Sequence, residues 1–520
     1  MSPETGDGSF RIHKWMKSMV RHSKASELWK GQRWKELRRN LFRLQKRVYK
    51  AMRAGDYRKV RSLQRLIMKS RSAQLLAVRQ VTQLNKGKKT AGIDGKSSLS
   101  YRQRLELTEL LNQKGFDWKH NGLREKTIPK KNGKTRTLKI PTIADRAWQC
   151  LVKFALEPAH EALFHERSYG FRSGRGAHDA QRYIFSHLQS NHNGYRKRVI
   201  ELDIKKCFDR IFHKTIMERV ICPRGISIGL FRCLKAGVSP DFPEQGTPQG
   251  GVVSPLLANI ALDGIEAIHP SVRYADDMVI FLKPNDNAEE ILEKISTFLT
   301  SRGMEISQEK TRITKTTDGF DFLGWKFLVQ KNRKCKITPS TENFQAFREK
   351  IKAIINSSQY GAMKKAELLA PIVRGWRNYH RYCNMKGTRD RLWFPAKKAE
   401  TVFRSEPKIN RYQSKELINK AFPKVSWKEN GHVVVKGDKS PYNGDIVYWS
   451  RRKSKFYDGL TTKHLKKQDH KCGYCGLRFI SDESVHLHHI DGNHDNWKPK
   501  NLQVVHRSCH QLIHYKQSKT

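Results

Sequence analysis

Apolar positions in residues 26–85 recur three or four places apart, as at Leu37, Leu41, Leu44 and Val48. This is the period of an amphipathic helix, so we predict a helical N-terminal segment. Its polar face carries mainly Arg and Lys with few acids to pair them. Such a face is either simply solvated or in contact with RNA, and the scarcity of paired acids favours RNA.

Shorter apolar runs in the middle of the chain predict strands. Residues 128–142 are typical of a basic hairpin with Asn132 and Gly133 as its turn. Residues 198–211 predict a strand, and residues 319–329 predict a second hairpin. Helical spacing is expected over residues 143–164, 286–302 and 340–400, and a short, turn-rich, β-like connector over 427–455.

One apolar run, VRYADDMVIFL at 272–282, holds two adjacent carboxylates, Asp276 and Asp277. Two such charges at ~4 Å repel by about 4 kcal/mol at an effective dielectric near 20, and a divalent cation would offset this. Neighbouring side chains of one strand point to opposite faces. Both carboxylates therefore face one ion only at a tight turn between strands 272–274 and 278–282. A solvated Asp-Asp turn is the alternative that this motif alone leaves open.

The 520 residues carry a formal net charge of +53. A surplus of this size indicates a polyanionic partner, and nucleic acid is the simplest one. A membrane-spanning helix is not expected because no run of ~18 apolar residues exists. The first ten residues have early acids and no apolar core, which excludes a secretory signal and disfavours a transit peptide. We expect a bacterial, nucleoid-associated cytoplasmic protein or a protein of an organelle matrix.

A third carboxylate, Asp203, also lies in an apolar strand, far before the Asp276–Asp277 pair. Carboxylates on different strands are what two-metal phosphoryl transfer needs, because together they hold two Mg²⁺ ions about 4 Å apart. A Gly/Pro loop and an apolar helix over residues 245–265 separate the two acidic strands.

Several motifs resemble those of a known family. LDIKKCFDRI, QGTPQGGVVSPLLANI, YADD and GFDFLGWKF, in this order, are similar to the catalytic blocks of reverse transcriptases, specifically of group II intron-encoded proteins. TAGIDG, RTLKIPTIADRAWQ and YGFRSGRGAHDA resemble that family's earlier blocks. The resemblance runs from about residue 80 to the C-terminus. It implies an α+β multidomain fold, with the fingers and palm of a right-hand polymerase and a helical thumb.

The resemblance also implies roles for individual residues. Asp203, Asp276 and Asp277 correspond to the catalytic triad that binds two Mg²⁺ ions, and Ile204 would add its main-chain carbonyl. Phe208 falls where the family places an aromatic gate that excludes a 2′-hydroxyl. A plain core position is the alternative for Phe208.

Further positions are expected to bind substrate. Gln249 and Gly250 correspond to a loop that shapes the nucleotide and template pocket, and glycine permits a close backbone approach there. Lys134 and Arg136 of the basic hairpin are candidates for the triphosphate of an incoming dNTP, and Lys310 is a weaker one. Each cation has a solvated surface charge as its alternative.

Residues 368–384, LLAPIVRGWRNYHRYCN, resemble the maturase or X domain of the family's thumb. Helical spacing places Trp376 and Tyr379 in the core. The resemblance implies that this region binds the intron's own RNA. The candidate RNA-binding side chains are Arg374, Arg377 and Arg381.

The C-terminal tail has the spacing of a zinc site. Cys472 and Cys475 form one close pair, and His506 and Cys509 form another about 30 residues later, which is typical of tetrahedral structural zinc. A module this small has little core, so zinc would supply folding free energy. The six other cysteines are scattered and are typical of reduced thiols.

The same tail resembles an HNH endonuclease, a ββα-metal fold. In that pattern His489 is the general base and Asn501 fixes the loop that orients it, while His488 and His510 hold one divalent ion. Imidazole suits the base because its unperturbed pKa lies near 6.5. The family often has cysteine at the position of His506, which leaves the fourth zinc ligand less certain. A zinc ribbon without nuclease activity is the alternative.

These features predict a multifunctional group II intron-encoded protein. It would be an RNA-directed DNA polymerase, a maturase for its intron RNA, and an HNH endonuclease that nicks target DNA to prime reverse transcription. Its partners would be intron RNA, target DNA and dNTPs. A splicing factor with relic enzyme domains and a plain site-specific DNA nuclease are the alternatives. The expected divisions are a basic helical extension (1–80), fingers and palm (81–335), thumb (336–425), a DNA-binding connector (426–465) and the endonuclease (466–520).

Overall fold

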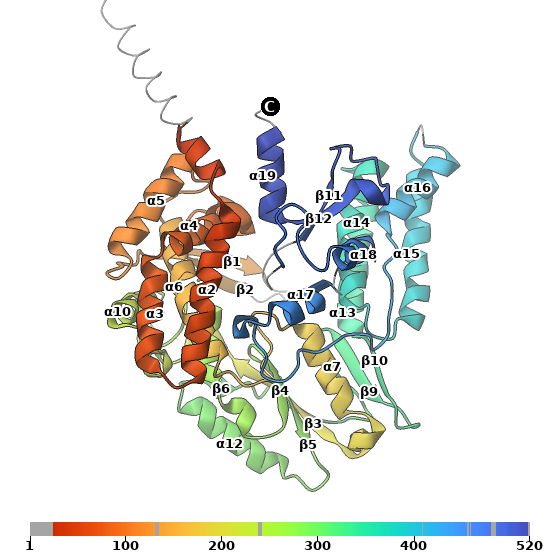
Figure 1. The fold of residues 1–520 in the computed structure, drawn as a ribbon. Helices are drawn as coiled ribbons and strands as arrows, with labels where there is room; N and C mark the ends of the chain where they lie inside the picture. The colour runs from red at the N-terminus through yellow and green to blue at the C-terminus, as the bar shows by residue number, and fades with distance from the viewer. Residues whose placement is uncertain are drawn as a thin grey trace, which may run out of the picture.

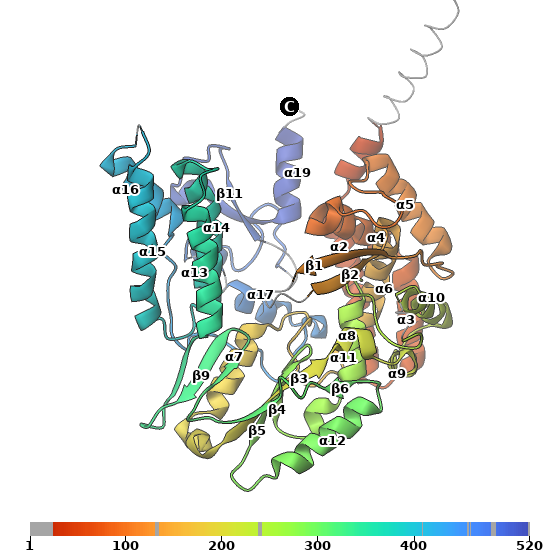
Figure 2. The same cartoon turned by 180° about the vertical axis from the view of Figure 1, so that it is seen from behind.

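The structure is a computed structural model. Figures 1 and 2 show the N-terminal helices on one side, the thumb helices on the other, and a β-sheet between them at the base. The C-terminal segment returns between the two sides. Within the described residues, no helix combines the length and the hydropathy that crossing a membrane requires. The described residues are 24–129, 135–237, 242–407, 409–454, 457, 459–479 and 485–517.

The central sheet is built around β3 (Arg198–Lys205), whose apolar side chains are buried. Its strands run antiparallel in the order β4-β5-β3-β6, and β7 also pairs with β3. The partners are β4 (Ser271–Tyr274), β5 (Asp277–Leu282), β6 (Glu305–Ile306) and β7 (Arg312–Lys315). The strand predicted in 198–211 and the hairpin predicted in 272–282 are thus confirmed. The neighbouring helices are α7 (Ala177–His187), α9 (His213–Arg219), α10 (Arg224–Lys235), α11 (Ser254–Leu262) and α12 (Ala288–Thr300).

The N-terminal helices share one apolar core with the palm. They are α2 (Trp34–Arg53), α3 (Tyr57–Lys69) and α4 (Arg71–Arg79), and they pack against α6 (Ile143–Glu161). The helical prediction for this region is confirmed. The division expected at residue 80 falls where α4 runs directly into a π-helical turn, η1 (Gln80–Leu84), so no break in the fold marks it.

The predicted basic hairpin forms between β1 (Arg124–Pro129) and β2 (Thr135–Ile140). The strands are antiparallel, and Ile128 lies opposite Arg136. Its tip, including Lys134 and the Asn132-Gly133 turn, lies outside the described residues. Helix α5 (Tyr101–Lys114) precedes the hairpin.

A three-stranded sheet leads into the thumb. It contains β8 (Phe320–Phe322), β9 (Trp325–Val329) and β10 (Cys335–Pro339), so the second predicted hairpin is confirmed. Four thumb helices then enclose a separate apolar core. They are α13 (Thr341–Ile355), α14 (Ala362–Tyr379), α15 (Lys386–Arg404) and α16 (Arg411–Ala421).

The prediction of a β-like connector is wrong. The described part of residues 427–455 contains no strand but a 3₁₀ turn (Pro441–Asn443) and helix α17 (Ile446–Ser454), followed by α18 (Gly459–Lys467). Its glycine- and asparagine-rich turns mimic a hairpin signal. Instead of pairing in a ladder, the segment bonds to the palm.

One buried carboxylate on α7, Asp179, anchors this connector. Its Oδ1 accepts hydrogen bonds from His432 Nε2 at 3.0 Å, Arg452 Nη2 at 2.6 Å and the Val435 amide at 3.1 Å. The buried cations and the hydrogen bonds outweigh the effect of burial and keep the pKa of Asp179 below its usual range. The connector is therefore part of the palm's packing.

Candidate functional site

The three predicted carboxylates lie together at one end of the paired strands β3 and β5 of the palm sheet. Asp203 of β3 lies directly opposite Asp277, the first residue of β5. Ala275 (φ 61°) and Asp276 form the turn between β4 and β5, and Tyr274 pairs with Asp277. The turn is thus two residues long, and Asp277 itself belongs to the returning strand.

Loss of hydration and neighbouring negative charge change the protonation of Asp276 and Asp277. Protein packed around the cluster removes hydration from Asp277, and the charges of Asp276 and Asp203 add to this, raising the pKa of Asp277 to about 6. Loss of hydration and the charge of Asp203 also raise the pKa of Asp276. The Lys310 ammonium donates to Asp203 Oδ2 at 2.6 Å, and this hydrogen bond raises the pKa of Lys310.

This donor set fits Mg²⁺. Three carboxylates at one end of the paired strands β3 and β5 supply the hard oxygen ligands that Mg²⁺ prefers. The pKa values of Asp276 and Asp277 are raised first by loss of hydration and then by the neighbouring negative charges, and a bound cation would offset both effects. Ile204, the other predicted donor, is buried and pairs with Ile306 of β6. The role of its carbonyl stays a prediction.

A buried arginine supports the acidic hairpin, and the sequence analysis missed it. Arg273 is fully buried, and its Nε donates to Glu266 Oε1 at 2.6 Å. Its Nη1 donates to the carbonyl of Ala275 in the turn at 3.1 Å. Burial alone would raise the pKa of Glu266, but the Arg273 charge and hydrogen bond more than offset this and lower it. Gly170 packs so close beneath that a Cβ there would lie 2.2 Å from the Ala275 nitrogen.

The predicted substrate-binding loop is tied to the basic hairpin. The side-chain oxygen of Gln249 accepts from Arg136 Nε at 2.5 Å, while its amide nitrogen donates to Asp209 Oδ1 at 2.8 Å. The Gln249 carbonyl accepts from the Lys139 amide at 2.9 Å. Gly250 has φ 132°, and a Cβ on it would lie 2.8 Å from the Lys139 carbonyl oxygen, so glycine is required there.

Phe208 lies next to this loop. Its ring meets the exposed Phe171 edge to face at 6.2 Å, and its carbonyl accepts from the Thr247 amide at 2.6 Å. The ring is half-buried and packs partly on the core, so the structure supports both the gate and the core alternative for Phe208.

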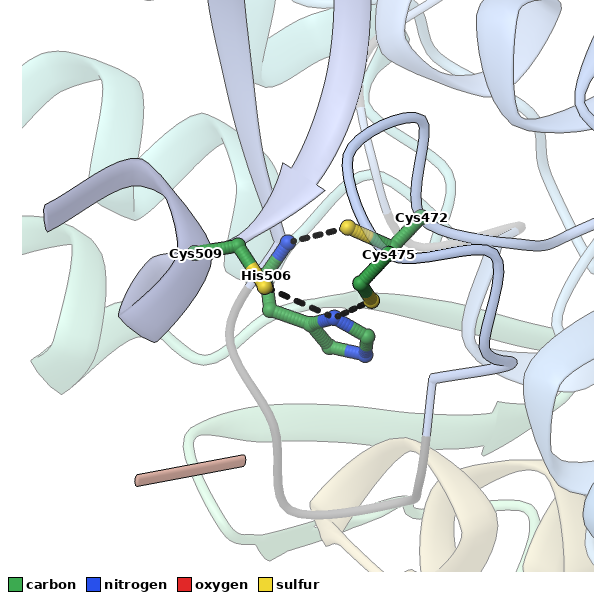
Figure 3. Close-up of side chains that lie close together, drawn as sticks. All are labelled: Cys472, Cys475, His506 and Cys509. Carbon is green, nitrogen blue, oxygen red and sulfur yellow. Dashed lines mark hydrogen bonds between the residues drawn. The ribbon is translucent and has the colours of Figure 1, made fainter. Parts of the chain in front are cut away.

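The four predicted zinc ligands converge (Figure 3). One ligand atom from each of Cys472, Cys475, His506 and Cys509 lies within 4.8 Å of all the others. His506 Nδ1 faces the sulfurs of Cys475 at 3.3 Å and Cys509 at 3.7 Å. The cluster joins the loop at 472–475 to the end of β12 (Leu502–His506) and the start of α19 (Arg507–Gln517). Its atoms fit zinc with imidazole as the fourth ligand.

A second cluster contains a residue that the sequence analysis missed. His488 and His510 come together as predicted, and His514 joins them with its ligand atom within 4.8 Å of both. His488 belongs to β11 (Val485–His489), which pairs with β12, and the two others lie on α19. The four-residue spacing of His510 and His514 was the available signal, because it places both on one helix face.

His489 and Asn501 lie beside this cluster. Adjacent strand positions point to opposite faces, so His489 turns away from His488. Its ring is buried against Trp497 at 5.0 Å, and its Nε2 has no hydrogen-bond partner among the described residues. Asn501 accepts from the Asp491 amide at 3.0 Å and donates to the Asp491 carboxylate at 2.8 Å, fixing the loop after His489.

The predicted RNA-binding arginines of α14 lie in different environments. Arg374 is exposed. Arg377 donates to the carbonyls of Phe422 and Pro423, and Arg381 donates to Ser426 Oγ. As predicted, Trp376 and Tyr379 pack inward. Trp376 stacks on Phe347 and Tyr379 on Trp325, at 4.3 and 4.5 Å between ring centroids.

A palm sheet that presents three converging carboxylates, flanked by a basic hairpin and a helical thumb, defines a right-hand nucleic-acid polymerase. Residues 128–327 match the family described as reverse transcriptase (RNA-dependent DNA polymerase). Residues 29–111 match the N-terminal domain of reverse transcriptase, and residues 344–415 match the group II intron, maturase-specific domain.

Individual relatives agree with these matches. The chain is 37% identical over 409 residues to "Maturase-like protein 1" of Euglena gracilis, covering 77% of this chain and 89% of the relative. It is 36% identical over 434 residues to "Maturase-like protein 1" of Euglena longa, covering 83% and 91%. It is 26% identical over 377 residues to "Group II intron-encoded protein LtrA" of Lactococcus lactis subsp. cremoris, covering 56% and 62%. The chain therefore belongs to the reverse transcriptase–maturases encoded by group II introns.

The Arg273–Glu266 pair should govern the stability of the palm. Replacing Arg273→Met leaves Glu266 buried without its partner, and we expect the free energy of unfolding to fall by about 3–5 kcal/mol. Urea unfolding followed by tryptophan fluorescence measures this. The control Lys294→Met breaks the exposed Lys294–Glu290 ion pair and should leave unfolding unchanged. Equal midpoints for the two variants would contradict a supporting role for Arg273.

The cysteine–histidine cluster should bind zinc. We expect about one zinc per purified chain by elemental mass spectrometry, and its loss in Cys472→Ala and Cys509→Ala because three ligands hold the ion poorly. Cys335→Ala removes a buried thiol of β10 and should retain the metal. Zinc content that is the same in all variants would rule out this site.

Proposed function

We propose that this reverse transcriptase–maturase copies RNA into DNA at the carboxylate cluster and nicks DNA with its C-terminal module, so that the nicked strand primes the copy. The observation that carries the proposal is the register that sets Asp203 opposite Asp277, with Asp276 in the adjoining turn. The palm carboxylates and the C-terminal cysteine and histidine clusters lie in different parts of the fold, which supports two distinct reactions on nucleic acid.

At the polymerase site, Asp203, Asp276 and Asp277 would hold Mg²⁺, which activates the primer 3′-oxygen and neutralises the leaving pyrophosphate. The chain's own groups position the substrates. Arg136 of β2 lies close enough to the cluster for its charge to oppose part of the rise in the pKa of Asp276, and it is suited to contact the triphosphate of a dNTP. Gln249 holds Arg136 in place, and Gly250 lets the loop pack closely against the Lys139 backbone of β2. Lys310, beside Asp203, is a further phosphate contact, and Phe208 is the candidate sugar gate.

We further propose that residues 466–520 form an HNH endonuclease with zinc in the Cys472/Cys475/His506/Cys509 cluster. The paired strands β11 and β12 followed by α19 support the ββα arrangement. His488, His510 and His514 would hold a divalent ion that stabilises the charge on the cleaved phosphate. His489 is the proposed general base that takes a proton from water, and Asn501 holds the loop that orients it.

The maturase role rests on the thumb. The match to the group II intron maturase-specific domain supports binding of intron RNA and assistance to splicing. On α14 the exposed Arg374 is the arginine best placed to contact phosphate. Arg377 and Arg381 already donate to protein groups, which supports a role in holding the RNA-binding surface in shape.

A splicing factor with relic enzyme domains is the competing function. Burial and the neighbouring carboxylates raise the pKa of Asp276 and Asp277, so this cluster weakens the fold unless it binds a cation, and its presence favours an active polymerase. For the cellular compartment, the similarity to the Euglena proteins favours an organelle matrix over a bacterial cytoplasm.

Primer extension tests the polymerase. With an RNA template, a DNA primer, dNTPs and Mg²⁺, Asp277→Asn should lower the extension rate by about a thousandfold or more, because it removes charge where the metal ions bind. Asp318→Asn, which alters an exposed carboxylate away from the cluster, should retain the wild-type rate. Extension by Asp277→Asn at the wild-type rate, or no extension by the wild-type protein, would refute the polymerase assignment.

Strand nicking tests the second site. His489→Ala should abolish nicking of target DNA while leaving primer extension intact, because the two clusters lie in different modules. Asp277→Asn should have the opposite pattern, and His192→Ala, on the exposed palm surface, should affect neither. Loss of both activities in His489→Ala would contradict two independent sites.

A further inference from the structure

Helix α2 and the C-terminal module that holds the proposed zinc site enclose a groove of about 570 Å³, which borders that site through His506. One wall is α2, and the opposite walls are residues 444–447, which lead into α17, and residues 477–478 beside the zinc cluster. Figure 1 shows α17 and α19 next to α2. Lys35 of α2, which lines the groove, donates to the carbonyl of Cys475 at 3.3 Å and so joins α2 to the C-terminal module.

The groove is strongly cationic. Helix α2 carries eight Lys or Arg residues and one acid, Glu36. Arg39 and Arg43, four residues apart, are exposed, and neither forms an ion pair within the described part of the chain. Arg478 adds a cation from the zinc-containing module, oriented by hydrogen bonds to Asp469 at 2.7 Å. The basic groups that line the groove are Lys35, Arg39, Arg43, Lys46 and Arg478.

Apolar side chains line the same groove. Its apolar lining consists of Phe42 of α2, which is buried, together with Ile446, Val447 and Leu477, and Val447 is 38% exposed. Cations beside an apolar, partly aromatic surface suit a nucleic-acid strand whose phosphates meet the charges and whose unpaired base meets the apolar wall. A duplex hides its base faces in its own stack, so this apolar surface favours a single strand.

The lining of the groove also includes one acidic residue. Asp445 lines the groove, and its carboxylate is held by Lys439 at 2.7 Å and by the Tyr448 amide at 3.0 Å. A fixed carboxylate repels phosphate but accepts a hydrogen bond from a ribose 2′-hydroxyl, which DNA lacks. We therefore propose that the groove between α2 and the zinc-containing module binds a single-stranded segment of RNA. This gives the C-terminal module a role in RNA binding in addition to the proposed nicking.

Local photo-cross-linking tests the site in the full chain. A photoreactive phenylalanine analogue replacing Val447 should cross-link to an unstructured RNA of roughly ten nucleotides, a length that one such groove can accommodate. The same analogue replacing Leu66, which is 47% exposed on α3, should not. Unlabelled single-stranded RNA should compete, whereas single-stranded DNA, duplex RNA and abasic RNA should compete at least about tenfold less well.

Charge reversal supplies the matched control. Arg39→Glu with Arg43→Glu should abolish the cross-link at position 447 and lower the slope of log affinity against log salt by about 1.4, for two lost phosphate contacts. Arg61→Glu with Arg65→Glu makes the same charge change at the same spacing on exposed α3 positions and should affect neither. Circular dichroism spectra and thermal midpoints that match those of the wild-type protein show that both double variants are folded. The milder pair Arg39→Gln with Arg43→Gln replaces the first one if the reversed pair fails to fold.

Three results would overturn the proposal. Equal loss of cross-linking in the two double variants would show a general charge effect. Equal competition by single-stranded DNA would remove the assignment to RNA. Cross-linking that survives removal of Arg39 and Arg43 would show that the groove does not hold the strand. None of these results depends on the outcome of the primer-extension or nicking assays.

Discussion

Electrostatic repulsion among three carboxylates is the constraint on which this molecule's arrangement depends. Burial and the neighbouring carboxylates raise the pKa of Asp276 and Asp277, and the palm must hold these two groups beside Asp203. Antiparallel pairing fixes Asp203 against Asp277, and the buried Arg273 holds the carbonyl of the turn. The apolar sheet interior supplies the stabilisation that offsets the repulsion. The carboxylate cluster of the polymerase site is therefore electrostatically unfavourable by itself, and the packed palm sheet holds it in place.

The other modules are joined to that support by buried polar contacts. Asp179 on α7 binds the connector through His432, Arg452 and the Val435 amide. The N-terminal helices contribute to the same apolar core as the palm. As a result the C-terminal module lies against α2 at a defined position, and surfaces from opposite ends of the sequence form one cationic groove.

Sequence reasoning worked where the chemistry is local. The spacing of Cys472, Cys475, His506 and Cys509 correctly identified four residues that the structure brings together. Sequence reasoning failed where the structure of a segment depends on bonding partners that lie far away in the sequence. The glycine- and asparagine-rich turns of residues 427–455 resemble those of a hairpin. No hairpin forms there because main-chain amides bond to the palm instead, as Val435 does to Asp179, and the neighbouring sequence does not indicate such a distant partner. Arg273 looked like an ordinary strand position because its partner Glu266 lies in a separate turn.

The sequence by itself determined which chemical groups are present and which local elements carry them, because hydrophobic period and turn residues act over a few positions. It thereby specified acidic strands, cysteine–histidine pairs and basic helices. Only the tertiary structure decided their pairing: Asp203 across from Asp277, His514 beside His488 and His510, and α2 beside Arg478. The physical reason is that such contacts follow from how whole elements pack their apolar faces, and this depends on the entire chain.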